Sequence, residues 1–257
     1  MSASIQDAIM LLGDSLTQGG WEAHGFAQRL AFAYNRKLDV INRGMSGYNT
    51  EWIIPVFEQC FATQNEQQHV PKVRLLTIWL GANDAATEGT PQYVPLPAYS
   101  ANLAKLVRTV TDSASAHYSP VTRILLLTPP PVNTHQWAAH RAEQNQTLDR
   151  NFEKTRTYAQ AVRDVGKQVG VPVVDLWTAL WDACGHVEEQ LSEYLSDGLH
   201  LTDRGYAIVF DEIMKSVSEN YPELHYDKLP PVFELWDKIN LENPLSSLSK
   251  RDIFSSA

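Results

Sequence analysis

Five near-continuous apolar runs, each followed by a helical pattern, constrain the fold of this chain more than any other feature. Each run has the length of a β-strand, and its apolar residues do not alternate with polar ones, which is typical of parallel strands buried on both faces. The runs are residues 8–12, 37–42, 73–80, 121–128 and 171–176. Helical periodicity follows at residues 26–34, 51–61, 99–113, about 135–169 and 202–219. This alternation predicts βαβ units and an α/β fold, a three-layer α/β/α sandwich with a five-stranded parallel sheet.

Most of the chain is expected to form one domain, because 257 residues can bury a single sizeable core. We place this domain at residues 1–225 and a C-terminal extension, helical or irregular, at residues 226–257. In the extension, a Pro-Pro pair precedes an apolar stripe from Val232 to Ile239, and such a stripe has to pack on something. We expect it to pack on the domain or on a partner subunit of a homodimer, where it borders the site or forms a subunit contact.

Composition and charge exclude several classes of partner. The net charge of −9 argues against a nucleic-acid or anionic-membrane surface, and no apolar stretch approaches the ~20 residues of a membrane span. The first residues have no basic region of the kind that opens a secretory signal. The two cysteines, Cys60 and Cys184, stand in no metal-binding spacing and are interpreted as reduced thiols. The sequence therefore predicts a cytoplasmic protein without metal or cofactor.

Polar side chains follow the strands at the edge where parallel sheets bind ligands, outside the carboxyl ends of the strands. The first run ends in Gly13 and is followed directly by Ser15, while Asp197 and His200 stand together well after the fifth run. A serine hydroxyl needs a base to take its proton, histidine is the usual base near neutral pH, and a carboxylate orients the histidine. These residues predict a catalytic triad of Ser15, His200 and Asp197.

The same edge offers hydrogen-bond donors for an oxyanion, the negative charge that develops on a carbonyl oxygen during acyl transfer. We predict three donors: the Ser15 N–H, the Gly44 N–H after the second strand, and the Asn83 side-chain amide after the third. Each signal alone has a structural explanation, since Gly-Asp-Ser and Asn-Asp can cap helices and most histidines in loops are solvated. Their occurrence together at strand ends favours catalysis.

Four blocks, "GDSLTQ", "NRGMSGYNT", "GAND" and "DGLHLT", together resemble the GDSL or SGNH hydrolases. The resemblance extends from about Ala8 to the helix after His200, and the longer strings look like the isoamyl acetate-hydrolysing esterase branch. It implies a flavodoxin-like sheet and metal-free hydrolysis of small short-chain, acetate-type esters through an acyl-enzyme. The family's nucleophile, oxyanion glycine, oxyanion asparagine, and catalytic acid and histidine match Ser15, Gly44, Asn83, Asp197 and His200.

Rival interpretations have less support in the sequence. Ser46 in "GMSGY" lacks the G-x-S-x-G elbow because position 48 is tyrosine, and no HExxH, P-loop or G-x-G-x-x-G motif occurs. Within the family, thioesterase, lysophospholipase and carbohydrate-deacetylase activities remain open, since fold and triad do not set the substrate. A non-catalytic flavodoxin-like binding protein would explain the fold, but not why these polar residues converge.

Overall fold

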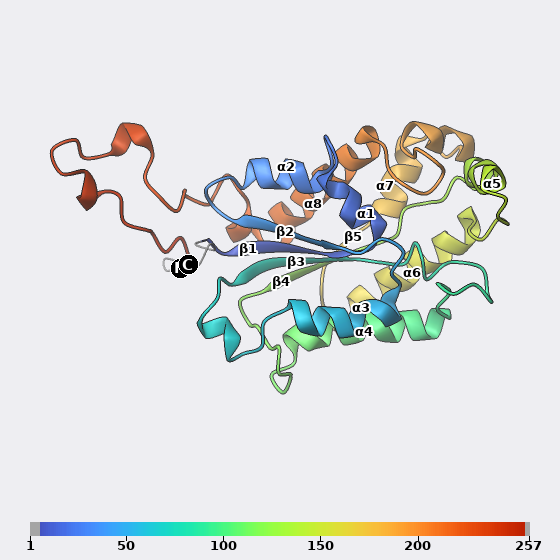
Figure 1. Ribbon diagram of the computed structural model, residues 1–257, viewed down its shortest axis with the longest axis horizontal. Helices are drawn as coiled ribbons and strands as arrows, with labels where there is room; N and C mark the ends of the chain where they lie inside the picture. Colours follow the sequence, from blue (N-terminus) through green and yellow to red (C-terminus); the bar gives the residue numbers. More distant parts are fainter. Residues whose placement is uncertain (1–5, 255–257) are drawn as a thin grey trace.

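The structure is a computed structural model and describes residues 6–254 (Figure 1). Its centre is a sheet of five parallel strands in the order β2-β1-β3-β4-β5. The strands are β1 (Ala8–Gly13), β2 (Asp39–Gly44), β3 (Val73–Trp79), β4 (Arg123–Leu127) and β5 (Val173–Val174). Helices cover both faces of this sheet, so the predicted three-layer α/β/α sandwich is confirmed.

Eight α-helices are found among residues 6–254: α1 (Ser15–Gln18), α2 (Phe26–Ala33), α3 (Thr50–Cys60), α4 (Leu96–Thr111), α5 (Thr134–Glu143), α6 (Phe152–Val169), α7 (Leu176–Ala183) and α8 (Asp203–Asn220). Helices α2, α7 and α8 lie on one face of the sheet, and α3, α4 and α6 on the other (Figure 1). The long helical pattern predicted after the fourth strand is two helices, α5 and α6. None of these described helices is long and apolar enough to cross a membrane.

The sheet divides the apolar core into two parts, one under each helical layer. Along β1, Ile9 and Leu11 face one part, while Met10 and Leu12 face the other. All four side chains are almost fully buried. A strand buried on both faces gains nothing from alternating polar residues, which is why the apolar run in the sequence is continuous.

The transition from β1 to α1 positions Ser15. Gly13 pairs with β2 on one side and β3 on the other, and a Cβ on it would lie 2.5 Å from the Trp79 carbonyl oxygen. Asp14 follows as the N-cap of α1, where Oδ1 accepts a hydrogen bond from the Leu16 N–H at 3.0 Å. The strand therefore passes directly into a helix, with Ser15 as the first helical residue at the carboxyl end of the sheet.

The C-terminal segment forms a loop, residues 232–251, that projects from the body of the protein (Figure 1). Its two ends are held together, because the Val232 N–H donates to the Arg36 carbonyl and the Arg251 N–H donates to the Val232 carbonyl. The apolar stripe is divided: Val232 is buried, while Trp236 in a short 3₁₀ turn is 83% exposed. The loop leaves the body beside the residues that precede β1 and β3. It therefore does not border the site of its own chain, contrary to one of the two expectations above.

Candidate active site

Ser15, His200 and Asp197 form a continuous hydrogen-bonded chain. The Ser15 Oγ lies 3.0 Å from His200 Nε2, although the two residues are 185 positions apart. On the other side of the ring, His200 Nδ1 lies 2.7 Å from Asp197 Oδ2. The second oxygen of Asp197 accepts hydrogen bonds from the N–H groups of Leu199 and His200 itself. This is the arrangement that lets a histidine take a serine proton while a carboxylate supports the imidazolium.

A tight turn before α8 directs the side chains of Asp197 and His200 toward each other. Leu195 and Leu201 pair as an antiparallel bridge across this turn, and Gly198 at its centre has a φ of +97°. A Cβ on Gly198 would lie 2.4 Å from the backbone nitrogen of Trp137. Both the positive φ and the close approach of α5 therefore require glycine at this position.

The pKa values of Asp197 and His200 suit proton transfer from Ser15. Burial raises the pKa of Asp197, but hydrogen bonds from the His200 side chain and nearby backbone N–H groups outweigh it and lower this pKa to about 2. The hydrogen bond to Asp197 raises the pKa of His200 above its ordinary value, against the opposing effect of burial. An ionised Asp197 holds the imidazole proton on Nδ1, which leaves Nε2 free to accept the proton of Ser15.

Asp14, next to the nucleophile, is almost completely buried, and its Oδ2 finds no hydrogen-bond partner among residues 6–254. Burial, together with the nearby Asp84 carboxylate, raises the pKa of this carboxyl group to about 7, although the hydrogen bond from the Leu16 N–H lowers it. The other carboxylate oxygen, Oδ1, caps α1, so Asp14 stabilises the turn that positions Ser15.

Asn83 lies buried at the end of β3 with its amide held in one orientation. Its Oδ1 accepts hydrogen bonds from Arg150 Nη2 at 2.8 Å and Gln92 Nε2 at 3.1 Å. Its Nδ2 donates one proton to the Tyr48 carbonyl oxygen at 2.9 Å. Because a guanidinium only donates, the atom facing Arg150 must be the amide oxygen, and Nδ2 keeps a second proton for another acceptor.

The structure does not favour Gly44 as an oxyanion donor. Its N–H donates to Asn42 Oδ1 at 2.8 Å, within its own strand. A Cβ at this position would lie 2.0 Å from the Gln18 backbone nitrogen. A glycine is therefore needed here because α1 packs directly against β2, and this explanation requires no contact with a substrate.

Gly47, three residues further along the same block, stands next to Asn83. Its carbonyl oxygen accepts a hydrogen bond from Gln92, and the next carbonyl, that of Tyr48, accepts one from Asn83. Gly47 has a φ of +81°, and its own N–H has no acceptor in the part of the chain that the structure describes. The sequence string "NRGMSGYNT" contains this second glycine, but the order of motifs alone does not distinguish it from Gly44.

Helix α5 contributes two aromatic rings behind the triad that the sequence did not indicate. The Trp137 ring meets His200 edge-on at 6.4 Å between centroids and stacks on His140 at 5.3 Å. His140 Nε2 lies 4.0 Å from Asp197 Oδ2. Through these contacts α5 packs against the turn formed by residues 197–200.

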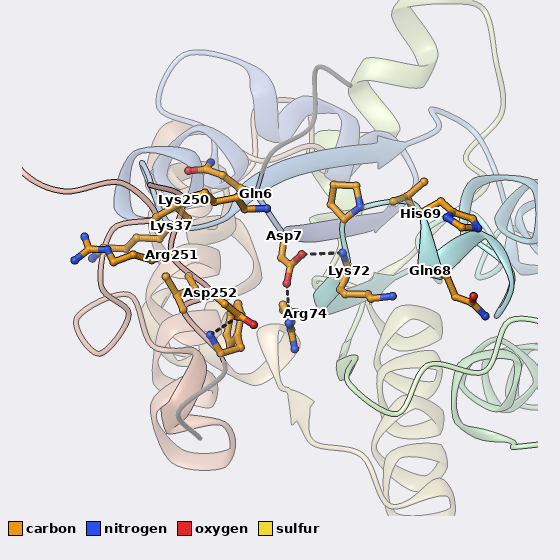
Figure 2. A pocket seen from close by; sticks show the side chains of 15 residues that line it. Gln6, Asp7, Lys37, Gln68, His69, Lys72, Arg74, Lys250, Arg251 and Asp252 are labelled. Carbon is orange, nitrogen blue, oxygen red and sulfur yellow. Dashed lines mark hydrogen bonds and ion pairs between the residues drawn. The ribbon is translucent and has the colours of Figure 1, made fainter. Parts of the chain in front are cut away.

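A cavity lies at the other end of the strands from Ser15, beside the base of the C-terminal loop (Figure 2). It is a cavity of about 580 Å³ with several basic side chains in its wall. Figure 2 shows Asp7 between Lys72 and Arg74, with its carboxylate bonded to the Lys72 backbone N–H and to Arg74 Nε. Among the residues that the structure describes, no serine or cysteine lines this cavity, in contrast to the site at Ser15. Within residues 6–254, no cluster of three or more His, Cys, Asp or Glu side chains could hold a metal ion.

The chain is similar to known proteins both in sequence and in fold. The family model described as GDSL-like Lipase/Acylhydrolase matches residues 11–208. A GDSL esterase/lipase of Arabidopsis thaliana is 32% identical over 251 residues, which cover 95% of this chain and 98% of the relative. The isoamyl acetate-hydrolyzing esterase 1 homolog of Homo sapiens is 32% identical over 249 residues, covering 96% and 94%. Among solved structures, a lipase/acylhydrolase from Enterococcus faecalis has a TM-score of 0.61 at 21% identity and covers 88% of this chain and 98% of that chain.

Proposed function

Because this chain belongs to the GDSL-like lipase/acylhydrolase family, and is therefore an ester hydrolase, we propose that it cleaves short-chain carboxylic esters with Ser15 as nucleophile. The observation that carries the proposal is the chain of contacts from Ser15 Oγ through His200 to Asp197. Acetate esters are the first substrates to consider, because several relatives are named isoamyl acetate-hydrolyzing esterases.

The reaction proceeds in two steps. As Ser15 Oγ attacks the ester carbonyl carbon, its proton passes to His200 Nε2, and a tetrahedral oxyanion forms. When the oxyanion collapses, the bond to the alcohol breaks, the alcohol oxygen takes the proton from His200, and an acyl-Ser15 ester remains. A water molecule then repeats the attack with His200 as base, which releases the carboxylic acid and restores the serine. Asp197 stays ionised throughout and stabilises the imidazolium.

The oxyanion hole of this proposal has three donors. The Ser15 N–H is in the first turn of α1, where backbone N–H groups lack helical partners. The Asn83 amide contributes the Nδ2 proton that Tyr48 does not use. Gly47 is the third donor in place of Gly44, because its N–H is unoccupied among the described residues and its turn is bonded to Asn83. Such donors act mainly on the charge that develops in the transition state.

Hydrolysis by wild-type protein and by the Ser15→Ala variant tests the proposal. With p-nitrophenyl acetate we expect a fall in kcat on the order of 10⁴-fold or more for Ser15→Ala, with an unchanged circular dichroism spectrum. The exposed Ser46 is the matched control, and Ser46→Ala should keep its activity. A fluorophosphonate probe should label Ser15, as mass spectrometry of peptides would show. Labelling of another residue, or an inactive but folded Ser46→Ala variant, would contradict the assignment.

A substrate panel separates this function from its relatives. Esters of acetate, butyrate and octanoate, an acetyl thioester and an acetylated sugar all use the same triad. The highest kcat/KM on the simple acetate ester supports the proposal. A preference for the octanoate ester, the thioester or the acetylated sugar would favour lysophospholipase, thioesterase or deacetylase activity. Absence of turnover with every ester would favour the non-catalytic binding protein.

We also propose that the C-terminal extension joins two copies of this chain into a homodimer. Its projecting loop exposes Trp236, Leu241 and Leu245 by more than 80% each, although its base is fixed to the body. A groove of about 670 Å³ lies nearby along the edge strand β2, where Met10, Ile41 and Phe61 stand among charged side chains such as Arg43 and Glu58. A loop and a groove on one chain allow two copies to exchange loops symmetrically.

For the location, the free thiols of Cys60 and Cys184 support our proposal of a reducing compartment such as the cytoplasm.

A further inference from the structure

Arg150 is a buried cation whose contacts extend beyond its ion pair. Only 3% of the residue is exposed, in the segment between α5 and α6. Its Nη1 pairs with Asp149 Oδ2 at 2.7 Å, and its Nε donates to the Ala82 carbonyl at 2.8 Å. Its Nη2 donates to Asn83 Oδ1 at 2.8 Å and to Gln92 Oε1 at 2.6 Å. Three of its four acceptors are therefore neutral groups in the segment that carries Asn83.

A buried ion pair by itself is weak evidence for a functional role, since charges inside proteins are ordinarily paired. Asp149 is already supplied with donors from elsewhere: Trp137 Nε1 bonds to its Oδ1 at 2.9 Å, and Arg141 Nη2 lies 3.3 Å from its Oδ2. Neutralising Asp149 therefore does not explain why Arg150 points toward Ala82 and Asn83. The planar guanidinium can donate to the Asn83 amide oxygen and to the Ala82 carbonyl at the same time, whereas a lysine ammonium group lacks this forked geometry.

The contact with Arg150 decides which end of the Asn83 amide faces outward. If the amide rotated by half a turn, its NH₂ group would face a guanidinium that can only donate. The oxygen would then take the place of Nδ2 and would repel a developing oxyanion. A charged donor on Oδ1 also polarises the amide and strengthens its remaining N–H as a donor.

Gln92 extends the same support to the second donor. Its Nε2 donates to Asn83 Oδ1 at 3.1 Å and to the Gly47 carbonyl at 2.8 Å, while its Oε1 accepts from Arg150. One side chain therefore connects the buried cation, the Asn83 amide and the Gly47 turn. A shift of Arg150 would be transmitted to both donors, because Gln92 bonds to each of them.

We propose that Arg150 and Gln92 are positioning residues that hold the Asn83 amide and the Gly47 turn in the arrangement an oxyanion requires. The proposal rests on the esterase function proposed above. It assigns these side chains no contact with substrate and no part in proton transfer. Their effect should fall on the transition state, so kcat should change while KM stays nearly constant.

The first test is Arg150→Lys, which keeps the positive charge beside Asp149 but cannot reproduce the fork of hydrogen bonds. We expect kcat for p-nitrophenyl acetate to fall about 10- to 100-fold, below the 10²–10³ lost when an oxyanion donor is removed outright. Arg141→Gln is the matched control, because Arg141 also contacts Asp149 but not Asn83, and it should keep wild-type kcat. A wild-type kcat for folded Arg150→Lys, or an equal loss in Arg141→Gln, would overturn the proposal.

A double-mutant cycle with Asn83→Ala shows whether Arg150 acts through Asn83. Arg150→Lys should cost little further kcat once Asn83 is removed, because the group that it orients is absent. The same fold-loss in both backgrounds would overturn the proposal. Gln92→Met provides a second variant without a buried charge change, and it should lower kcat with KM nearly unchanged. If Arg150→Lys fails to fold, a wild-type kcat for Gln92→Met overturns the proposal on its own.

A readout independent of activity distinguishes failure of this inference from failure of the proposed function. In ¹⁵N-labelled wild-type protein, the two Nδ2 protons of Asn83 should give separate, slowly exchanging NMR signals, assigned with Asn83→Ala. In Arg150→Lys, exchange should accelerate or the signals should merge, while Arg141→Gln should resemble wild type. If the wild-type protein hydrolyses no ester, this comparison still tests the orientation. Unchanged Asn83 signals in folded Arg150→Lys would overturn it.

Discussion

His200 is expected to control the pH dependence of catalysis at the level of single side chains. The Asp197 hydrogen bond raises the pKa of His200 above its ordinary value, and only the neutral ring can take the Ser15 proton. Activity should therefore be lost as the pH falls through the raised pKa. We predict that kcat/KM plotted against pH rises to a plateau, with a midpoint above about 6.5.

Two variants test which titrating group sets the midpoint of this pH profile. Asp197→Asn removes the hydrogen-bonded charge, so it should lower the midpoint and reduce kcat by as much as ~10⁴-fold. Asp14→Asn is the control, because burial raises the pKa of Asp14 to about 7 and this carboxyl group could titrate in the same range. Asparagine also caps helices well, so α1 should be retained. A midpoint that moves with Asp14→Asn but not with Asp197→Asn would show that His200 is not the titrating base.

The contact between α1 and β2 is the packing of elements that presents the nucleophile. Helix α1 has only four residues, and Asn42 Nδ2 of β2 donates a hydrogen bond to its Thr17 carbonyl oxygen at 2.7 Å. Gly44→Ala should destabilise the protein by about 3 kcal/mol or more, because its Cβ would meet backbone atoms that cannot move independently. Urea unfolding followed by fluorescence measures this loss.

Gly89→Ala is the matched control for that measurement. Gly89 has a positive φ, and no atom of the described residues lies within 4 Å of an added Cβ, so this variant isolates backbone strain of about 1–2 kcal/mol. Gly44→Ala should lose clearly more free energy of unfolding than Gly89→Ala. If the two losses are equal, or Gly44→Ala loses less, α1 does not depend on close packing against β2.

At the scale of the whole molecule, we expect the proposed homodimer to depend on the projecting C-terminal loop. Replacing Trp236, Leu241 and Leu245 together by glutamate should convert a dimer into a monomer, because charges would have to be buried at the interface. Light scattering coupled to size-exclusion chromatography gives the mass. The triple variant should still be labelled at Ser15 by a fluorophosphonate, since the loop lies at the end of the sheet where β1 begins and α1 lies at the other end (Figure 1).

Val187→Glu is the control, since this exposed side chain follows α7, away from the loop. It should leave the mass of the assembly unchanged. A wild-type protein that is monomeric at every concentration tested would contradict the dimer. An unchanged dimer in the triple variant would show that another surface joins the copies.

Local features of the sequence were sufficient for the fold class and for selecting Ser15, Asp197 and His200, which the structure brings into contact. Apolar runs report burial on both faces of a strand, and the Gly13-Asp14-Ser15 string combines a turn, a cap and a hydroxyl within three residues. Asp197 and His200 are three residues apart, so their pairing is itself a local property. The short helix α7 was missed because its residues continue an apolar run. Asp175 caps α7 and leaves β5 only two residues, which hydrophobicity does not reveal.

The surroundings of the triad were decided only by the tertiary structure. Arg150 reaches Asn83 across 67 residues of sequence, and no local pattern distinguishes it from a solvated arginine. The choice between Gly44 and Gly47 depends on which N–H already has an acceptor, and that acceptor is positioned by the folded strand. The direction of the C-terminal loop likewise follows from where Arg36 and Val232 meet. Periodicity along a chain determines which residues are buried, whereas hydrogen-bond partners distant in sequence are determined when the packed elements bring them together.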